Sequence, residues 1–436
     1  MSHLLIVELP GGNDTDLLHA ARRRGDSFVF LTARAAHYRA QPAVQAWLDR
    51  AEAQIEVPSF DFDAVLQQVM ARHAAHRFDA LLCLIDIRLV EAARLAQALG
   101  LRHLNPASAT LLRDKPSVRQ RLRERGIAQA DFRLATSNAA LRQAVAELGL
   151  PVLVKPADGY GSQNIVLLRD ETDLDPLLSP LDDLLPSRAD YGLGVHANDR
   201  LLVERYMQGR LVGCDTFSVD GEHRLLGVHD KLMFEPPSFA MRGSTFAAGH
   251  ADLDAIRCHA FEVLDAVGFD HGAAHIEMML TPDGPRLVEI NPRLVGAKLP
   301  RLLDMVLGGS VHADLIALHA GAPLPAPHAA GDAVAALRWI VTDRAGTLDG
   351  VTLPSTDDSR IRCAEILKSP GDAVRPPLEN VDRIGYVMAC GSARAEIEAL
   401  AEHAVAATRV RLRDGAQPAT AASPSSLPNS VAKLPA

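Results

Sequence analysis

Short apolar runs alternate with helical patterns along the first hundred residues. The runs LLIVELP, SFVFLTA and ALLCLID, the last at residues 80–86, have the length and apolar content of buried strands. Helical patterns lie between and after them: one ends at Arg24, one covers residues 63–76, and one runs from Leu89 to Leu99. This alternation predicts a parallel, Rossmann-like α/β unit. Gly11-Gly12 falls short of G-x-G-x-x-G, so it does not by itself indicate a dinucleotide site.

The middle of the chain mixes helical patterns with pairs of strands. Asp114-Lys115-Pro116 has the form of a helix start, with Asp as the cap and Pro in the first turn. Asn138–Leu148 and Ala251–Val267 read as further helices. Two hairpins are expected, turning at Asp220-Gly221 and around Pro282-Asp283-Gly284, because Asp-Gly favours tight hairpin turns.

Changes in composition mark the connections and the end of the chain. Residues 179–199 are polar and interrupted by Pro and Gly, which indicates a loop. The stretch GAPLPAPHAAGD at 321–332 reads as a linker into a smaller α+β unit that ends near Arg413. Residues 414–436 are rich in Ala, Pro and Ser and are expected to be disordered.

The overall composition is that of an ordinary globular protein, with 48% hydrophobic and 23% charged residues among 436. A net charge of −9 gives no support for nucleic acid or an anionic membrane as the main partner. No apolar run reaches the roughly 18 residues of a membrane span, and the start lacks the features of a signal peptide, so a cytoplasmic protein is expected. The five cysteines form no C-x-x-C pair, so neither a disulfide framework nor a zinc site is indicated.

Lysine is rare in this chain, although basic residues are not. Only six of the 45 basic residues are lysine. A position that keeps Lys where Arg otherwise prevails indicates a need for a compact, flexible ammonium group. The six are Lys115, Lys155, Lys231, Lys298, Lys368 and Lys433.

A glycine-rich turn follows one of these lysines. Lys155-Pro156 is followed by Asp158-Gly-Tyr-Gly-Ser162 between two predicted strands. Glycines at 159 and 161 allow backbone N–H groups to approach phosphate oxygens, and Lys155 can neutralise their charge. The turn is not a Walker A loop, and a flexible hairpin tip is the alternative interpretation.

Polar residues alternate in the stretch LVEINPR. Glu289, Asn291 and Arg293 are two apart, so in a strand they share one face, and Pro292 is expected to end that strand and bring Arg293 toward a loop. Glu277 lies on the other arm of the same predicted hairpin. Both carboxylates and the amide oxygen are thus predicted to converge on a hard cation such as Mg²⁺. An exposed hairpin face with unrelated acids is the alternative.

In their order along the chain, these stretches resemble the ATP-grasp superfamily of carboxylate-amine ligases. The resemblance covers about residues 1–413 and rests on DKPSVRQRLRERGI, VLVKPADGYGSQNI, LLVERYMQG, and AAHIEMML followed by LVEINPR. The stretches GVHDKLMFEPPSF and DGPRLVEINPRL and the C-terminal unit are most similar to bacterial L-amino acid ligases, which form dipeptides. The resemblance implies an α/β ATP-grasp fold in five parts: a Rossmann-like N-terminal domain (1–110), a lid region (111–200), a main domain with the Mg²⁺ site (201–325), a C-terminal α+β domain (332–413) and the disordered tail (414–436).

The resemblance also implies a nucleotide site. Lys115 and Lys155 would contact the ATP phosphates, with the loop Gly159–Gln163 closing over them. The segment Glu204–Met207 would form a hinge whose backbone pairs with adenine. The residues expected to bind the nucleotide are Lys115, Lys155, Gly159, Gly161, Ser162, Gln163, Glu204, Arg205, Tyr206, Met207, Asp215 and Lys231.

The metal and substrate roles follow in the same way. Glu277, Glu289 and Asn291 would hold one or two Mg²⁺ ions, with Mn²⁺ as a substitute. Arg293 would hold a carboxylate and then the acyl phosphate, a task suited to its two-pronged guanidinium group. The expected substrate residues are Arg242, Gly243, Ser244, His275 and Arg293, and the expected catalytic residues are Arg293, Lys155 and Ser244.

Two stretches depart from the family pattern. The ribose-binding acid usually found in G-x-E after the hinge has no direct equivalent in GRLVGCD, and Asp215 is the expected replacement. Where amino acid ligases have a stretch like FVELGH, this chain reads FAMRGS, with Met241 and Ser244 at the positions of the acid and histidine and Arg242 between them. This change puts a free α-amino group on the first substrate in doubt and favours an added anionic group.

The predicted function is an ATP-dependent ligase that activates a small carboxylate as its acyl phosphate and joins it to an amine, releasing ADP and phosphate. The alternatives are an ATP-sensing or scaffold protein that no longer ligates, and a carboxylase-type enzyme that uses bicarbonate. A homodimer is typical of the proteins that the chain resembles. Neither substrate is identified by the sequence.

Overall fold

The computed structural model describes most of the chain. The described residues are 1–157, 159, 165–170, 173, 200–236, 238–326, 331–354 and 357–413. The loop expected at 179–199 and the tail expected at 414–436 lie outside them.

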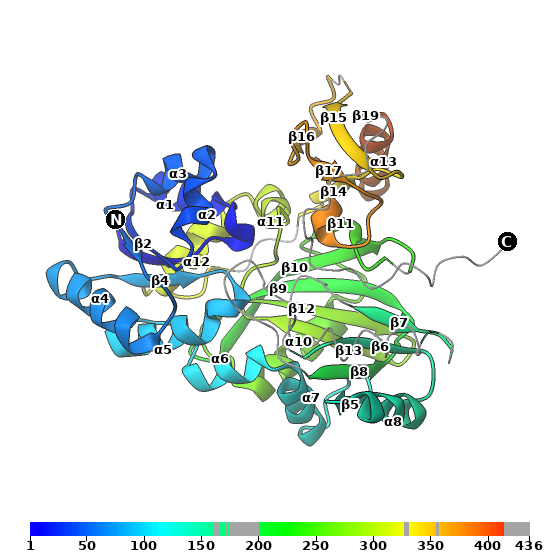
Figure 1. Ribbon diagram of the computed structural model, residues 1–436, viewed down its shortest axis with the longest axis horizontal. Helices are drawn as coiled ribbons and strands as arrows, with labels where there is room; N and C mark the ends of the chain where they lie inside the picture. Colours follow the sequence, from blue (N-terminus) through cyan, green and yellow to red (C-terminus); the bar gives the residue numbers. More distant parts are fainter. Residues whose placement is uncertain are drawn as a thin grey trace.

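A four-stranded parallel sheet forms the N-terminal unit, which is drawn in blue in Figure 1. Its strand order is β3-β2-β1-β4, with all pairs parallel, so the Rossmann-like unit is confirmed. The strands are β1 (His3–Val7), β2 (Ser27–Thr32), β3 (Ala53–Glu56) and β4 (Ala80–Cys83). The helices are α1 (Asp16–Arg24), α2 (Ala35–Arg39), α3 (Pro42–Leu48), α4 (Phe62–Ala75) and α5 (Leu89–Leu99).

A second, smaller sheet is antiparallel and has the order β5-β8-β6-β7. Its strands are β5 (Phe132–Ala135), β6 (Val152–Pro156), β7 (Val166–Leu168) and β8 (Leu201–Arg205), and the neighbouring helices are α6 (Pro106–Arg113), α7 (Lys115–Glu124) and α8 (Asn138–Leu148). Asp114 caps α7 as predicted, because its carboxylate accepts the backbone N–H of Ser117 at 3.1 Å. The predicted domain boundary before residue 201 separates β8 from the sheet to which it belongs, since β8 pairs with both β5 and β6.

The large central sheet has eight strands in the order β13-β12-β9-β10-β11-β14-β18-β16. They are β9 (Arg210–Val219), β10 (Glu222–Met233), β11 (Met241–Ala247), β12 (Gly272–Thr281), β13 (Gly284–Asn291), β14 (Val334–Ile340), β16 (Ile361–Ile366) and β18 (Gly385–Gly391). The first hairpin turns at Asp220 and Gly221, both with positive φ (53° and 82°), as an Asp-Gly hairpin turn requires. Because β14 pairs with β11, the C-terminal unit continues the main sheet instead of forming a separate layer.

Alternate residues of the central sheet face two different layers. Val212 and Cys214 of β9 pack against α10 (Leu253–Val267), and α13 (Arg394–Ala406) covers the same face at β14 and β18. Phe217 faces the other side, in one apolar core with α11 (Pro300–Leu307), α12 (Val311–His319) and the N-terminal unit. A three-stranded sheet, β17 (Ala373–Val374), β15 (Gly346–Thr352) and β19 (Arg409–Arg413), completes the C-terminal unit. In the described part of the chain no single helix is long and apolar enough to cross a membrane, although the bent pair α11 and α12 passes that test together.

Asp304 of α11 provides a test of this packing. Burial, reinforced by the nearby Asp16 carboxylate, raises the pKa of Asp304 to about 6, although the backbone N–H of Val311 donates to it at 2.8 Å. A carboxyl group with a higher pKa in the folded state holds its proton more tightly there. The free energy of unfolding should therefore fall as the pH rises from 3.8 to about 6.

We expect Asp304→Asn to be more stable than the natural protein at pH 7, by on the order of 1 kcal/mol or more, and to lose this advantage near pH 4. Urea unfolding across this pH range measures the effect. The exposed Asp343 gives the control variant Asp343→Asn, which should match the natural protein throughout. An equal response of both variants would contradict the assignment.

Candidate active site

Two glutamates face each other across the β12–β13 pair. Glu277 lies directly opposite Glu289, and His275 lies directly opposite Asn291, so all four side chains share one face of the sheet. Strand β13 ends at Asn291, immediately before Pro292, as predicted. The three oxygen-bearing side chains proposed to hold a metal are therefore brought together, and two carboxylates with an amide oxygen are the donor set that Mg²⁺ prefers.

Each glutamate contacts a lysine. Lys231 Nζ from β10 contacts Glu277 Oε1, and Lys115 Nζ from the start of α7 lies 3.0 Å from Glu289 Oε1. Burial opposes ionisation of Glu277, but the charge of Lys231 and its hydrogen bond to the carboxylate hold the pKa of Glu277 below the usual range. Glu277 is thus kept charged, and it lies directly opposite Glu289, an arrangement that suits a divalent cation.

Lys155 belongs to a buried ionic group in the smaller sheet. Its Nζ lies 2.6 Å from Glu204 Oε2, and Arg119 Nε donates to Glu204 Oε1 at 2.6 Å. Arg119 also donates to the backbone oxygen of Val288, one residue before Glu289. Although burial opposes it, the charges of Arg119 and Lys155 lower the pKa of Glu204 to about 2. Two cations share one carboxylate, so the group carries a net positive charge toward its surroundings.

A pocket lies between α7, the glycine turn and β13. Lys115 Nζ contacts the carbonyl oxygen of Gly159 at its rim, whereas the predicted loop residues Gly161, Ser162 and Gln163 lie outside the described part of the chain. The pocket combines apolar walls with cationic groups, as a site for a base and its phosphates requires. Its lining residues are Asp86, Leu112, Arg113, Lys115, Val118, Arg119, Gly159, Leu287, Val288, Glu289, Ile290, Asn291 and Pro292.

Several polar groups of the predicted adenine hinge already bind other parts of the protein. The side chain of Glu204 is committed to the buried ionic group, and Glu204 pairs with both β5 and β6. The backbone N–H of Arg205 donates to Asp131 O at 2.9 Å, and that of Tyr206 donates to Pro151 O at 3.0 Å. Met207 follows these residues, and its adenine contact stays a prediction.

Arg293 binds a carboxylate from the N-terminal unit. Its Nε and Nη2 donate to Asp86 Oδ2 at 2.9 and 2.7 Å, and its Nη1 donates to the backbone oxygen of Leu294 at 2.9 Å. Burial disfavours the Asp86 anion, but the adjacent guanidinium keeps its pKa below the usual value. Arg293 thus already binds an acid, and the sequence analysis missed that acid. Asp86 could have been found from its position shortly after the buried parallel strand β4, at the end of the sheet where α/β proteins bind ligands.

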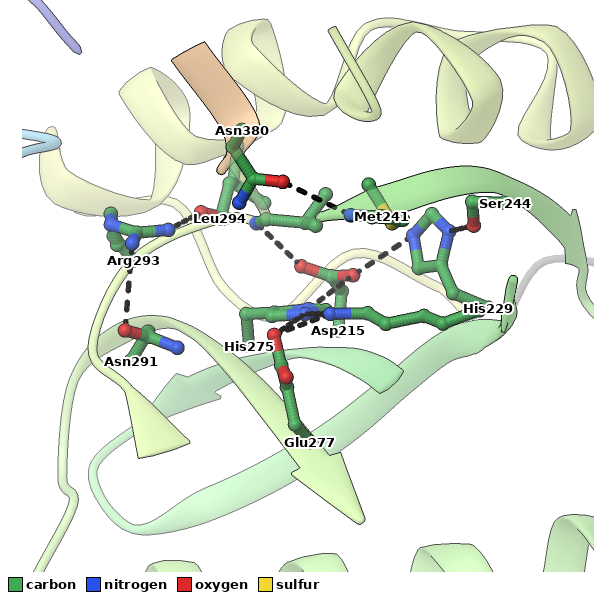
Figure 2. Close-up of polar contacts among 12 residues, drawn as sticks. Asp215, His229, Met241, Ser244, His275, Glu277, Asn291, Arg293, Leu294 and Asn380 are labelled. Carbon is green, nitrogen blue, oxygen red and sulfur yellow. Dashed lines mark hydrogen bonds and ion pairs between the residues drawn. The ribbon is translucent and has the colours of Figure 1, made fainter. Parts of the chain in front are cut away.

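Asp215 is not positioned to bind a ribose, which corrects the prediction. It is fully buried and accepts the backbone N–H of Val295 at 2.9 Å. Its other oxygen lies 3.1 Å from His275 Nδ1 and 3.2 Å from His229 Nε2, and His229 Nδ1 is 3.0 Å from Ser244 Oγ (Figure 2). This network joins the loop after Arg293 to β12, and His229 is a member that the sequence analysis missed.

The neighbouring polar atoms indicate which nitrogen of His275 carries the hydrogen. A buried carboxylate accepts hydrogen bonds, so His275 carries its hydrogen on Nδ1. His275 Nε2 is then the acceptor for Lys231 Nζ at 3.0 Å. A glycine makes this contact possible, because a Cβ at Gly213 would lie 2.6 Å from His275 Cε1 and 2.9 Å from Lys231 Cε. Lys231 can therefore cross β9 to reach Glu277.

Arg242 and Ser244 do not line one cavity, contrary to the prediction. The pairing of β10 with β11 shifts register between Leu232 and Met233, which leaves Arg242 as an extra residue. Arg242 donates to Glu402 of α13 at 3.2 Å, on the face opposite Ser244. Ser244 itself is fully buried. Gly243 is also structural, since a Cβ there would lie 2.6 Å from the oxygen of Leu337.

Comparisons with known proteins agree with this architecture. The model of the ATP-grasp N-terminal domain matches residues 18–103, that of the ATP-grasp domain matches 148–300, and that of the L-amino acid ligase C-terminal domain 2 matches 338–413. The fold is also that of an L-amino acid ligase from Bacillus licheniformis, with a TM-score of 0.76 and 18% identity over 95% of this chain and 99% of that one.

Two curated relatives are similar in sequence to this chain. The uncharacterized protein y4rH of Sinorhizobium fredii is 28% identical over 69% of this chain and 61% of its own length. Dapdiamide A synthase of Enterobacter agglomerans is 23% identical over 45% of this chain and 46% of its own length. The chain thus spans less than two thirds of either relative. The chain therefore carries ATP-grasp domains together with the C-terminal domain 2 of the L-amino acid ligases, in an ATP-grasp fold.

Proposed function

We propose that this protein is an ATP-dependent carboxylate-amine ligase that makes amide or peptide bonds between small molecules. The observation that carries the proposal is the convergence of Glu277, Glu289, Asn291 and Arg293 beside Lys115. This set combines metal-binding oxygens, a cation for phosphate and a guanidinium for a carboxylate. An ATP-binding protein without ligase activity would not need the last of these.

The chemistry requires activation of the acid. A carboxylate and an amine do not condense in water because an oxide or hydroxide is a poor leaving group. In the proposed reaction a carboxylate oxygen attacks the γ-phosphorus of ATP, and the bond to the β-phosphate oxygen breaks to release ADP. The amine then attacks the carbonyl carbon, the carbon–oxygen bond to phosphate breaks, and the amine loses a proton to the surroundings.

The cationic side chains and the metal ion are assigned to the phosphates of ATP. Lys115 and Lys155 are assigned to the phosphates, and the unbalanced positive charge of the Arg119–Lys155–Glu204 group supports this role. Mg²⁺ or Mn²⁺, held by Glu277, Glu289 and Asn291, would neutralise phosphate charge when bound.

Arg293 is assigned to the acid substrate. Its hold on Asp86 shows that its surroundings accommodate a carboxylate, and a substrate acid would take the place of Asp86. Ser244 and Arg242 are not included among the substrate contacts, because one is buried and the other faces α13.

The relatives support the class of substrate. The names L-arginine-specific L-amino acid ligase, of Bacillus subtilis, and dapdiamide A synthase describe enzymes that join amino acids or related acids and amines. With the L-amino acid ligase C-terminal domain, they favour an amino acid or a close analogue as one partner. The cytoplasmic location and the homodimer stay predictions.

Glu289→Gln tests the metal-site assignment. The variant keeps the size of the side chain but removes a charge that would hold the metal, so amine-dependent ADP release should fall by on the order of 10²-fold or more. The matched control is Glu222→Gln, an exposed acid of the same sheet, which should retain normal turnover. Coupled detection of ADP and phosphate, across a panel of acids and amines, is the measurement.

The outcomes of this panel separate the rival functions. Phosphate release that depends on both an acid and an amine supports the ligase. Stimulation by bicarbonate alone would identify a carboxylase-type enzyme, and nucleotide binding without turnover would identify a non-ligating protein. Formation of AMP in place of ADP would exclude the acyl-phosphate route.

Arg293→Lys tests the carboxylate assignment. Lysine keeps the charge but loses the planar fork, so kcat/KM for the acid should fall about 10- to 100-fold, the equivalent of one or two hydrogen bonds to a charged group. Arg242→Lys should change it less than about 3-fold, because Arg242 faces Glu402 on the other side of the sheet. Equal losses in both variants would restore Arg242 to the substrate site and refute the placement given above.

A further inference from the structure

Two histidines and a glutamate cluster at the amino ends of the strands of the N-terminal sheet, whereas Asp86 lies at the carboxyl ends. His3 begins β1, Glu52 immediately precedes β3, and His76 follows the last residue of α4. All three therefore lie at the amino ends of the parallel strands, whereas Asp86 follows the carboxyl end of β4. The proposed ligase chemistry uses none of them.

The three side chains converge on a small volume. His3 Nε2 lies 3.3 Å from Glu52 Oε2, and His76 Nδ1 lies 3.1 Å from Glu52 Oε1. One nitrogen from each ring and one carboxylate oxygen all lie within 4.8 Å of one another. The two imidazole rings are stacked, with centroids 3.7 Å apart, so the exposed His76 ring would turn out of the stack to bind the same ion as His3.

His3 provides the second, independent observation. Its ring is only 4% exposed, and its Nδ1 lies 3.2 Å from the backbone oxygen of Arg77. A carbonyl oxygen only accepts, so Nδ1 carries the hydrogen and a neutral His3 has its lone pair on Nε2. This Nε2 is buried without a hydrogen-bond partner among the described residues and points at a carboxylate. The lone pair of His3 Nε2 and the Glu52 carboxylate repel each other at 3.3 Å, and a cation between them would remove that repulsion.

Glu52 and His76 are both exposed, unlike His3. The side chains of Glu52 and His76 are 41% and 57% exposed, so both can adjust toward an ion, and water can fill a fourth position. A hydrogen bond from His76 lowers the pKa of Glu52, which keeps the carboxylate charged at neutral pH. The set thus offers one fixed, buried nitrogen and two adaptable ligands.

We propose that His3, Glu52 and His76 form a structural site for a divalent transition-metal ion, with Zn²⁺ as the type. Two imidazoles and one carboxylate suit zinc, whereas the all-oxygen set of Glu277, Glu289 and Asn291 suits magnesium, so the two sites differ in the ions that they select. A bound ion would connect the first strand, the segment before β3 and the end of α4.

Cobalt is the probe for this site, because Co²⁺ in tetrahedral nitrogen and oxygen coordination absorbs visible light. The experiment uses the full chain without an affinity tag and with Mg²⁺ in excess, so that the magnesium-type site is filled. We expect the protein to bind one Co²⁺ with this absorption and to lose it when Zn²⁺ is added. Zn²⁺ should also raise the melting temperature of the natural protein.

Two variants and a matched control decide the result. His76→Ala and Glu52→Gln each change an exposed side chain, and each should weaken Zn²⁺ binding at least about 10-fold, since even the loss of an outer partner of a metal ligand costs about 10- to 100-fold. His403→Ala removes another exposed histidine, on α13, and should bind as the natural protein does.

Two outcomes would overturn the proposal. One is unchanged Co²⁺ and Zn²⁺ binding in His76→Ala and Glu52→Gln. The other is a natural protein that binds neither ion at this site. Ligase turnover should be unchanged in both variants, so this result is independent of the proposed function.

Discussion

The close approach of two glutamates on neighbouring strands is the constraint on which the site depends. Glu277 and Glu289 lie directly opposite each other on neighbouring strands, an arrangement that destabilises a sheet when nothing balances it. Lys231 reaches Glu277 from β10, and Lys115 reaches Glu289 from α7. The balance therefore requires the strand register, the glycine at 213 and the position of α7 at the same time. A site with this requirement forms only when several parts of the fold are correctly assembled.

The parts that the sequence predicted are those with local signals. The helices Leu89–Leu99 and Asn138–Leu148 match because a glycine ends each one, and the first hairpin matches because Asp-Gly dictates its turn. Alternation in LVEINPR correctly placed Glu289 and Asn291 on one face. The same reasoning failed for Arg242 and Ser244, because one extra residue in a strand reverses the faces after it, and a β-bulge depends on the partner strand.

Long-range partners were the other part that the sequence did not predict. Asp86 meets Arg293 across 207 positions of the chain, and His229 and His275 meet on Asp215 in the interior of the sheet. Polar residues on strands are expected at the surface, so nothing in the sequence marks these as buried. Hydrogen bonds from Val295 and His275 compensate the burial of Asp215, and this shared carboxylate links the loop after Arg293 to the strand of Glu277.

The eight strands of the central sheet are continuous from the β12–β13 hairpin into the C-terminal unit (Figure 1). Hydrogen bonds between β11 and β14 join the two units, so neither can swing against the other without breaking a ladder. The small four-stranded sheet shares no strand with the central sheet, so no such ladder fixes its position. A shift of the C-terminal unit would therefore be transmitted to the β12–β13 pair through the three strands between β12 and β14.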